Sequence, residues 1–146
     1  MKTLFITLVT ILFVCLLFFV QFRDIPVGNT HIGELVERDG IFYKKFTDVP
    51  FTGRVDKGPT KGVFKNGERE GSWVWYYDNG QMRFKGDFRN GKKEGPWIYF
   101  YGKGQIDKKG DYKNDNKEGP WMSYTRDGSI VKEETGIYKN GEKISD

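Results

Sequence analysis

The residue types that most often carry out catalysis are scarce in this chain of 146 residues. His31 is its only histidine and Cys15 its only cysteine. A serine or cysteine nucleophile relies on a histidine base, and a metal centre built on histidines needs more than one. His31 falls in a predicted linker and Cys15 in a long apolar run, so neither arrangement is expected. We predict that the chain is not an enzyme and holds no cofactor and no metal.

A set of carboxylates recurs at a fixed interval and could in principle transfer protons. Each directly follows a basic residue: Glu70 after Arg69, Glu94 after Lys93 and Glu118 after Lys117. Recurrence in every unit favours turn structure and solvated ion pairs, each worth under about 1 kcal/mol, over a single active site. The glycine-rich segments also lack the Gly-Lys-Ser/Thr that ends a phosphate-binding loop.

Aromatic side chains are the best candidates for binding. Trp73, Trp97 and Trp121 are 24 residues apart, and each stands two residues after a glycine. Three series of glycines keep the same interval: Gly62, Gly86 and Gly110; Gly71, Gly95 and Gly119; Gly80, Gly104 and Gly128. A fixed period of this length predicts an array of small units that must stack on one another to bury their apolar faces.

Turn signals divide each unit into two strands. One series of turns is Asn66-Gly67, Asn90-Gly91, Asn114-Asp115 and Asn140-Gly141, and the other is Asn79-Gly80, Lys103-Gly104 and Asp127-Gly128. About ten residues separate successive turns, which suits strands and is too short for helices. Ahead of the array, Asp39-Gly40 predicts a type I′ hairpin between residues 35–38 and 41–44, and residues 51–55 predict a further strand.

Pairing across the second turn of each unit sets the register. With Asn79 and Gly80 at the centre of the turn, the predicted pairs are Tyr77 with Met82, Trp75 with Phe84 and Trp73 with Gly86. The same counting in the next unit pairs Tyr101 with Ile106, Tyr99 with Lys108 and Trp97 with Gly110. Each tryptophan then faces a glycine. Because glycine has no side chain, it leaves a gap on the sheet that a large ring can cover. In the third unit Trp121 is predicted to face Glu134, while Gly136 comes two residues later. We therefore predict a disturbed register there, with the alternation of faces kept.

This register gathers most rings, together with Met82 and Ile106, on one face of the sheet. The predicted binding residues on that face are Trp73, Trp75, Tyr77, Trp97, Tyr99, Tyr101 and Trp121. Two interpretations stay open: the rings form the core of the sheet, or some remain exposed and bind a partner strand, a peptide or a glycan. Residues 136–139 offer a second candidate, because an unpaired strand there could accept a partner strand unless charge protects it.

The first residues differ from the rest of the chain. Residues 3–22 contain no charge, and 16 of these 20 residues are apolar, enough for a helix to span a bilayer. No small-residue cleavage site follows, which favours an uncleaved transmembrane signal anchor at residues 1–22. Lys2 favours a body outside the cytoplasm, on the periplasmic side, whereas Lys44 and Lys45 count against it, so the orientation stays open.

The charge of the body argues against a nucleic-acid partner. Residues 23–146 carry 23 Lys and Arg against 20 Asp and Glu, a net charge of +3, with the two signs interspersed. A nucleic-acid footprint would gather its basic residues on one surface.

Two stretches of the array resemble a known repeat family. Residues 86–101, with Gly-Asp-Phe-Arg-Asn-Gly followed by Glu-Gly-Pro-Trp, resemble the bacterial variant of the MORN repeat, and so do residues 110–121. Residues 50–53 are also similar to a segment common in these proteins. The resemblance covers residues 34–146 and implies a row of β-hairpins that serves as a scaffold or interaction module. Some MORN proteins are linked to membranes or phosphoinositides, and many bacterial variant members are labelled toxin–antitoxin antitoxins. No catalytic motif is implied.

Together these patterns predict an all-β fold: an elongated single antiparallel sheet of repeated, MORN-like β-hairpins, plus one N-terminal transmembrane helix. The predicted parts are an anchor at 1–22, a linker at 23–33, a capping hairpin and strand at 34–60, and repeats at 61–84, 85–108, 109–134 and, in part, 135–146. The predicted function is a membrane-anchored, non-enzymatic module, held in the membrane by residues 3–22, that binds a protein or an envelope polymer. An antitoxin that neutralises a neighbouring toxin, and a carbohydrate-binding module acting through its aromatic face, are the alternatives.

Overall fold

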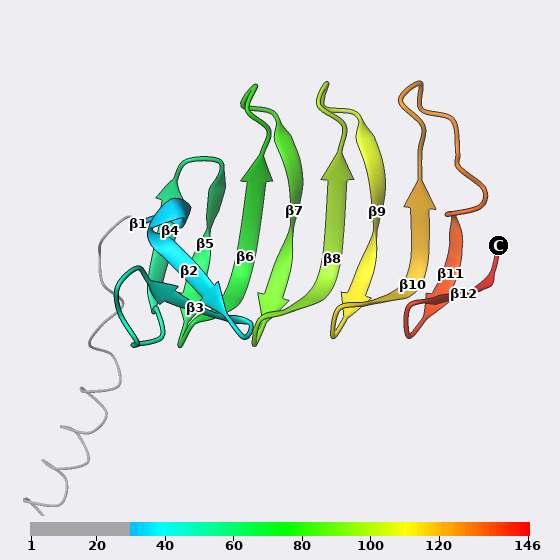
Figure 1. Cartoon of the computed structure of the whole chain (residues 1–146). Coiled ribbons are helices and arrows are strands. Elements are labelled where there is room, and N and C mark those ends of the chain that lie inside the picture. The colour runs from blue at the N-terminus through cyan, green and yellow to red at the C-terminus, as the bar shows by residue number, and fades with distance from the viewer. Residues whose placement is uncertain (1–29) are drawn as a thin grey trace, which may run out of the picture.

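The computed structural model describes residues 30–146, which form an elongated row of β-strands (Figure 1). The strands are β1 (Thr30–His31), β2 (Leu35–Arg38), β3 (Ile41–Lys44), β4 (Gly53–Lys57), β5 (Thr60–Lys65), β6 (Glu68–Tyr76), β7 (Met82–Arg89), β8 (Lys92–Phe100), β9 (Ile106–Lys113), β10 (Asn116–Ser123), β11 (Gly136–Lys139) and β12 (Glu142–Ser145). A 3-10 turn, η1 (Ile32–Glu34), follows β1. Ten strands form one sheet in the order β1-β4-β5-β6-β7-β8-β9-β10-β11-β12, and β2 and β3 form a separate hairpin.

The predicted fold class needs correction. Its all-β hairpin array is confirmed, but the strands form two sheets, and β1 pairs with β4 in the parallel direction. Within residues 30–146 no helix has the length and apolar character needed to cross a membrane. The transmembrane helix predicted for residues 1–22 lies outside the described residues, so nothing described supports it, and the fold class is all-β without it.

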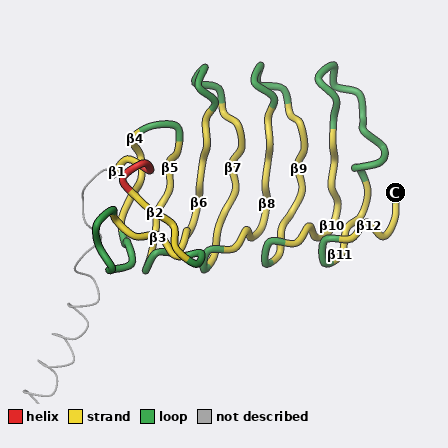
Figure 2. Tube along the Cα trace, in the orientation of Figure 1, coloured by secondary structure: helices red, strands yellow, loops and turns green. Residues whose placement is uncertain are grey.

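The type I′ turns form where the Asn-Gly signals predict them, along the lower side of the row in Figure 2. Both central residues have positive φ, for example 51° at Asn66 and 79° at Gly67. This conformation matches the twist of the flanking strands and suits asparagine and glycine. Asp115 adopts it as well, with φ of 68°, in the place where the other turns have glycine. The hairpin of β2 and β3 is built in the same way around Asp39 and Gly40.

The second series of turns has three loop residues rather than two. Gly80 N–H donates to Tyr77 O at 2.9 Å, and Tyr77 N–H donates to Gln81 O at 2.8 Å. The predicted pair of Tyr77 and Met82 is therefore wrong, because Met82 pairs with Tyr76. A one-residue bulge in β7 then cancels the offset and restores the predicted pairs of Trp75 with Phe84 and Trp73 with Gly86.

The next unit repeats this correction. Ile106 pairs with Phe100 instead of Tyr101, whereas Tyr99 pairs with Lys108 and Trp97 with Gly110 as predicted. Since residues paired across antiparallel strands share a face, Met82 and Ile106 belong with Tyr76 and Phe100 on the face opposite the tryptophans.

The third unit absorbs its two extra residues in a turn of its own. The N–H groups of Glu134 and Thr135 donate to Val131 O at 3.2 and 3.0 Å. Trp121 consequently pairs with Gly136 and not with the predicted Glu134. The disturbance stays in the loop, and the alternation of faces continues into β11 as expected.

The ends of the sheet differ from the prediction as well. β11 pairs with β10 on one side and β12 on the other, so residues 136–139 are not an open edge. The exposed edge is β12, a four-residue strand. At the other end, part of the predicted linker is ordered: His31 caps η1, accepting from Gly33 N–H at Nδ1 over 2.9 Å. His31 therefore has a structural role, while the predicted domain boundaries stay predictions.

Candidate binding face

The tryptophans lie in a continuous row of rings that crosses the strands. We call the side of the main sheet that carries this row the aromatic face. Neighbouring rings are 4.8 to 6.4 Å apart between centroids, mostly edge to face, in the order Phe64, Trp73, Phe88, Trp97, Tyr112, Trp121 and Tyr138. Edge-to-face contacts of this kind stabilise beyond the area that they bury. In a single-layer sheet this row takes the place of a conventional core.

Each tryptophan ring lies over a glycine, but not over the predicted one. The ring of Trp97 covers Gly86 of the preceding strand, where a Cβ atom would overlap the indole. Trp73 covers Gly62, and Trp121 covers Gly110, in the same way. The register pairs Trp97 with Gly110 of the following strand, as predicted, yet its ring points in the other direction.

A bulge with two extra residues explains this direction. In β8 the three residues Gly95, Pro96 and Trp97 stand opposite the single residue Gly86 of β7. Gly95 has φ of 65°, and its counterparts Gly71 and Gly119 have 65° and 70°. A left-handed residue in a strand bends the chain, and glycine adopts it at the least cost. The bend turns the indole back over the preceding strand.

The bulge also leaves a backbone carbonyl for the indole to bind. Trp73 Nε1 donates to Val63 O at 3.2 Å, and Trp97 Nε1 donates to Asp87 O at 3.2 Å. Trp121 Nε1 donates to Asp111 O at 2.9 Å. The three indoles are at most 1% exposed, so they hold the sheet together and present no ring surface to a ligand.

A second row of rings on the aromatic face is only half-buried. Trp75 stacks on Phe84 with 4.6 Å between centroids, and Phe84 lies 5.5 Å from Tyr99. Tyr77 and Tyr101 are half-buried too, and their hydroxyls donate to Phe100 O at 2.8 Å and Tyr124 O at 2.6 Å, one repeat further on. Of the predicted binding residues, these four remain accessible in part: Trp75, Tyr77, Tyr99 and Tyr101.

The basic residues of the repeats lie against rings rather than against carboxylates. Arg69 Cζ lies 4.6 Å from the centroid of Phe42, Lys93 Nζ lies 4.7 Å from that of Tyr112, and Lys117 Nζ lies 4.4 Å from that of Tyr138. Among residues 30–146 the ion pairs are Arg38 with Asp48 and Lys143 with Asp146. The predicted ion pairs with the neighbouring glutamates are therefore wrong, and cation–π contacts replace them.

The glutamates themselves have the predicted structural role at turns. A carboxylate oxygen of Glu70 accepts the N–H of Asn90 at 3.0 Å, Glu94 that of Asn114 at 3.1 Å, and Glu118 that of Asn140 at 3.0 Å. Each bond joins one repeat to the type I′ turn of the next. These carboxylates satisfy backbone donors that the turn leaves without a strand partner.

Burial changes the acidity of two groups on the aromatic face. It raises the pKa of Tyr99 well above the ordinary value, and the hydrogen bond between the hydroxyls of Tyr99 and Tyr112 adds to the rise. Burial also lowers the pKa of Arg69, against which the charges of Glu37 and Asp115 act. The rise favours the neutral hydroxyl of Tyr99 over the phenolate in the folded chain.

The other side of the sheet, which we call the opposite face, mixes apolar and charged side chains. A hollow of about 290 Å³ is lined by residues that include Val74, Ile98, Lys85 and Asp87. A second hollow, of about 250 Å³, is lined in part by Val63 and Val74. Ser72 Oγ donates to Asp87 Oδ1 at 2.5 Å in the lining of the first hollow. Within residues 30–146 no group of three or more His, Cys, Asp or Glu side chains lies close enough to hold a metal ion.

Comparison with protein families agrees with this repeat structure. The fold and the face define a protein of repeated β-hairpins. The family model of the MORN repeat variant matches residues 69–90 and 93–114, and these matches support a MORN-repeat protein. Each match begins at one of the basic residues and runs through a whole hairpin to the next type I′ turn. No curated protein matches the chain significantly.

Sequence reasoning missed the basic residues as part of this face. Their interval carried the signal, since Arg69, Lys93 and Lys117 recur every 24 residues, in step with the tryptophans. Each stands four residues before a tryptophan, so period-two alternation places it on the same face. The interpretation of these residues as partners of solvated ion pairs kept them out of the predicted face.

Proposed function

We propose that the chain is a non-enzymatic repeat module that binds another protein through its aromatic face. The observation that carries the proposal is the half-buried row of Trp75, Phe84 and Tyr99, which runs across three successive strands. Among the described strands, β2 and β3 alone lie outside the main sheet, and their hairpin packs against β5 through Phe42 and Phe64, whose ring centroids are 4.7 Å apart. Beyond that hairpin, the rings of this row have no described element over them.

The chemistry of the face fits recognition better than catalysis. Rings that are apolar on one side and carry hydroxyls or nearby cations are typical of protein interfaces, where aromatic and arginine side chains dominate the binding energy. The MORN-variant matches point in the same direction, because a repeat of this type presents surfaces and contributes no reacting group of its own. The repeated carboxylates are already used at turns.

Photo-crosslinking in cells that make the full-length chain tests the proposal. The crosslinking amino acid p-benzoylphenylalanine would replace Phe84 on the aromatic face or, as the matched control, Tyr76 on the opposite face. Both residues are half-buried aromatics of neighbouring strands. We expect a discrete protein adduct from position 84 and none from position 76. Adducts from position 76 alone, or from neither position, would contradict the proposal.

The alternatives have less support. Carbohydrate binding was predicted through Trp73, Trp97 and Trp121, and the burial of these indoles gives that hypothesis no support. The antitoxin role stays a prediction that no structural feature favours. The predicted membrane location and periplasmic side rest on residues outside the described structure and stay predictions as well.

A further inference from the structure

The basic residues that follow the type I′ turns form a series across the aromatic face. They occupy the same position in successive hairpins: Arg69 in β6, Lys93 in β8, Lys117 in β10 and Lys143 in β12. Strands in a sheet are about 4.8 Å apart, so equivalent positions two strands apart are separated by about 9.5 Å. The face thus presents a positive charge at a regular interval along the row of rings.

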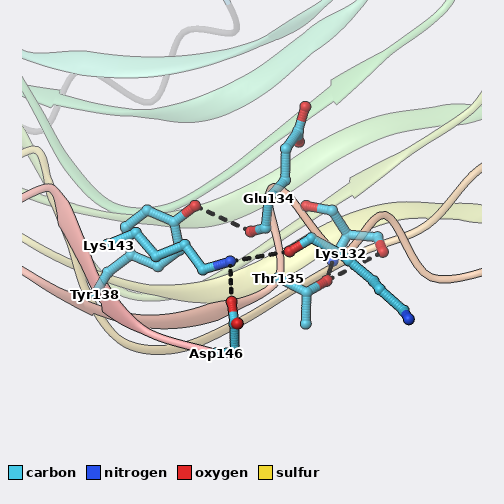
Figure 3. A network of polar contacts seen from close by, with 7 residues as sticks. Lys132, Glu134, Thr135, Tyr138, Lys143 and Asp146 are labelled. Atoms are coloured by element: carbon cyan, nitrogen blue, oxygen red, sulfur yellow. Dashed lines mark hydrogen bonds and ion pairs between the residues drawn. The ribbon is translucent and has the colours of Figure 1, made fainter.

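At both ends of the series, other residues of the chain contact the charged group of the basic side chain. At the β6 end, the hairpin places Phe42 against Arg69 at 4.6 Å, and the carboxylates of Glu37 and Asp115 act on its guanidinium. At the β12 end, Lys143 Nζ lies 2.7 Å from a carboxylate oxygen of Asp146 and donates to Lys132 O at 2.9 Å (Figure 3).

The two middle members lie on rings as Arg69 does, and they differ from Lys143 in having no carboxylate partner among the described residues. Within the described part of the chain, neither Lys93 nor Lys117 forms an ion pair with a carboxylate. Lys93 Nζ donates to Tyr99 Oη at 3.2 Å, and Lys117 Nζ rests on the rings of Trp121 and Tyr138. A half-buried ammonium held on rings is favourably placed to receive an anion from a partner. The contact of Lys143 with Asp146 shows which group suits this position.

The interval of the lysines restricts the shape of the ligand. An extended β-strand turns alternate side chains to opposite sides, so its residues three apart cannot both face the sheet. A polyproline II helix has three residues per turn and rises about 3.1 Å per residue, so side chains three apart share a side at about 9.3 Å. This distance matches the two-strand interval. Tyr112 lies on β9, between the strands of the two lysines, and the hydroxyl of Tyr99 lies 3.4 Å from that of Tyr112. These rings suit prolines, which dock in aromatic-lined grooves.

We propose that the aromatic face binds an acidic protein segment in the polyproline II conformation, with two carboxylates three residues apart, one on Lys93 and the other on Lys117. The proposal rests on the protein-binding function and gives its partner a chemistry. Charge complementarity selects the acidic residues, and the interval of the repeats selects their spacing.

Two synthetic peptides of the same composition test the spacing. The probe is acetyl-Pro-Glu-Pro-Pro-Glu-Pro-amide, and the comparison peptide is acetyl-Pro-Pro-Glu-Glu-Pro-Pro-amide. Calorimetric titration of the full-length chain at low salt would give both affinities. We expect the probe to bind about tenfold more tightly, and raised salt to weaken its binding, as for any charge pairing. Equal affinities, or no binding of the probe, would overturn the proposal.

Variants test the two lysines. Methionine keeps the aliphatic contact with the rings and removes the charge, so Lys93→Met with Lys117→Met is expected to weaken probe binding about tenfold. The matched control is Lys85→Met with Lys109→Met, in β7 and β9, which pair with Val74, Ile98 and Met122 of the opposite face. We expect the control to bind within about twofold of the natural chain, and Lys93→Arg with Lys117→Arg to retain binding. An unchanged affinity in the double methionine variant would overturn the proposal.

The same variants separate this proposal from the general function. If crosslinking at position 84 persists while the lysine variants and the peptide spacing have no effect, the acidic ligand is wrong and the protein-binding face stands. If crosslinking at position 84 fails, the general function fails with it.

Discussion

At the scale of single residues, the tryptophan–glycine contacts hold the repeats together. The indole of Trp97 fills the place above Gly86 and binds the carbonyl of Asp87, so one side chain satisfies both packing and a backbone acceptor. A single-layer sheet has no second layer whose packing could compensate for the loss of this contact. The three contacts should therefore be among the least tolerant positions of the chain.

Substitution of Gly86 by alanine tests this contact. A Cβ atom would overlap the Trp97 ring, and overpacking of this kind typically costs about 1–3 kcal/mol. Gly102→Ala is the matched control, because nothing lies within 4 Å of its added Cβ. We expect Gly86→Ala to lower the free energy of unfolding by about 2 kcal/mol or more in chemical denaturation, and Gly102→Ala to change it by less than about 0.5 kcal/mol. Equal effects would contradict the packing described.

The pKa of Tyr99 gives a prediction about alkaline pH. Its value is raised in the folded chain, whereas an exposed tyrosine ionises near pH 10. Below pH 10 the hydroxyl is neutral in both states; above it the unfolded chain loses the proton first, so the stability that Tyr99 contributes is lost as pH rises. Between pH 8 and pH 11, the free energy of unfolding should fall less for Tyr99→Phe than for the natural chain. Parallel losses would show that Tyr99 does not titrate as described.

At the scale of elements, the carboxylates after the basic residues join one hairpin to the next. Hydrogen bonds to charged groups contribute about 1.5–3 kcal/mol when buried and less when half-exposed. We expect Glu94→Ala to lower the free energy of unfolding by about 1 kcal/mol, since the N–H of Asn114 loses its partner. Glu133→Ala, at an exposed loop position, serves as control. Equal stabilities of Glu94→Ala and Glu133→Ala in thermal denaturation would contradict a stabilising role of the hydrogen bond between Glu94 and Asn114.

The third hairpin allows a test of register. Its Trp121-to-Gly136 interval is two residues longer than the Trp97-to-Gly110 interval, and the loop holds the extra length. We expect deletion of both Lys132 and Glu133 to preserve cooperative unfolding, because the faces of β11 keep their order. Deletion of Glu133 alone should abolish it, since a one-residue shift moves every side chain of β11 to the other face. Circular dichroism would distinguish the two, and similar melting of both deletions would contradict the register.

The turns and much of the register could be predicted from the sequence because their signals are local. Asn66-Gly67 specifies positive φ by itself, and its repetition fixes the strand lengths. The direction of the Trp97 ring could not be predicted, because it depends on the bulge at Gly95 and on the carbonyl that this bulge frees. A glycine within a strand is a signal for a bulge, yet it does not say how many residues face the partner strand.

At the scale of the whole molecule, residues 30–146 form a row of hairpins whose two ends differ. The β2–β3 hairpin covers the row at Phe64, and short β12 closes it beyond Tyr138 (Figure 1). Between these ends both sides of the sheet face outward, and the aromatic face carries the half-buried rings and the lysines. The aromatic character of the predicted site followed from the sequence. Which rings stay accessible did not, because burial depends on how the repeats stack.

Covalent footprinting of aromatic side chains would test the binding face most directly. Hydroxyl radicals would label the full-length chain in living cells and, separately, after purification. The account predicts that Trp75, Phe84 and Tyr99 are labelled less in cells than in the purified chain, while Tyr76, Phe100 and Tyr124 of the opposite face are labelled equally in both. Protection of the opposite face alone, or equal labelling of the aromatic face in both samples, would contradict it.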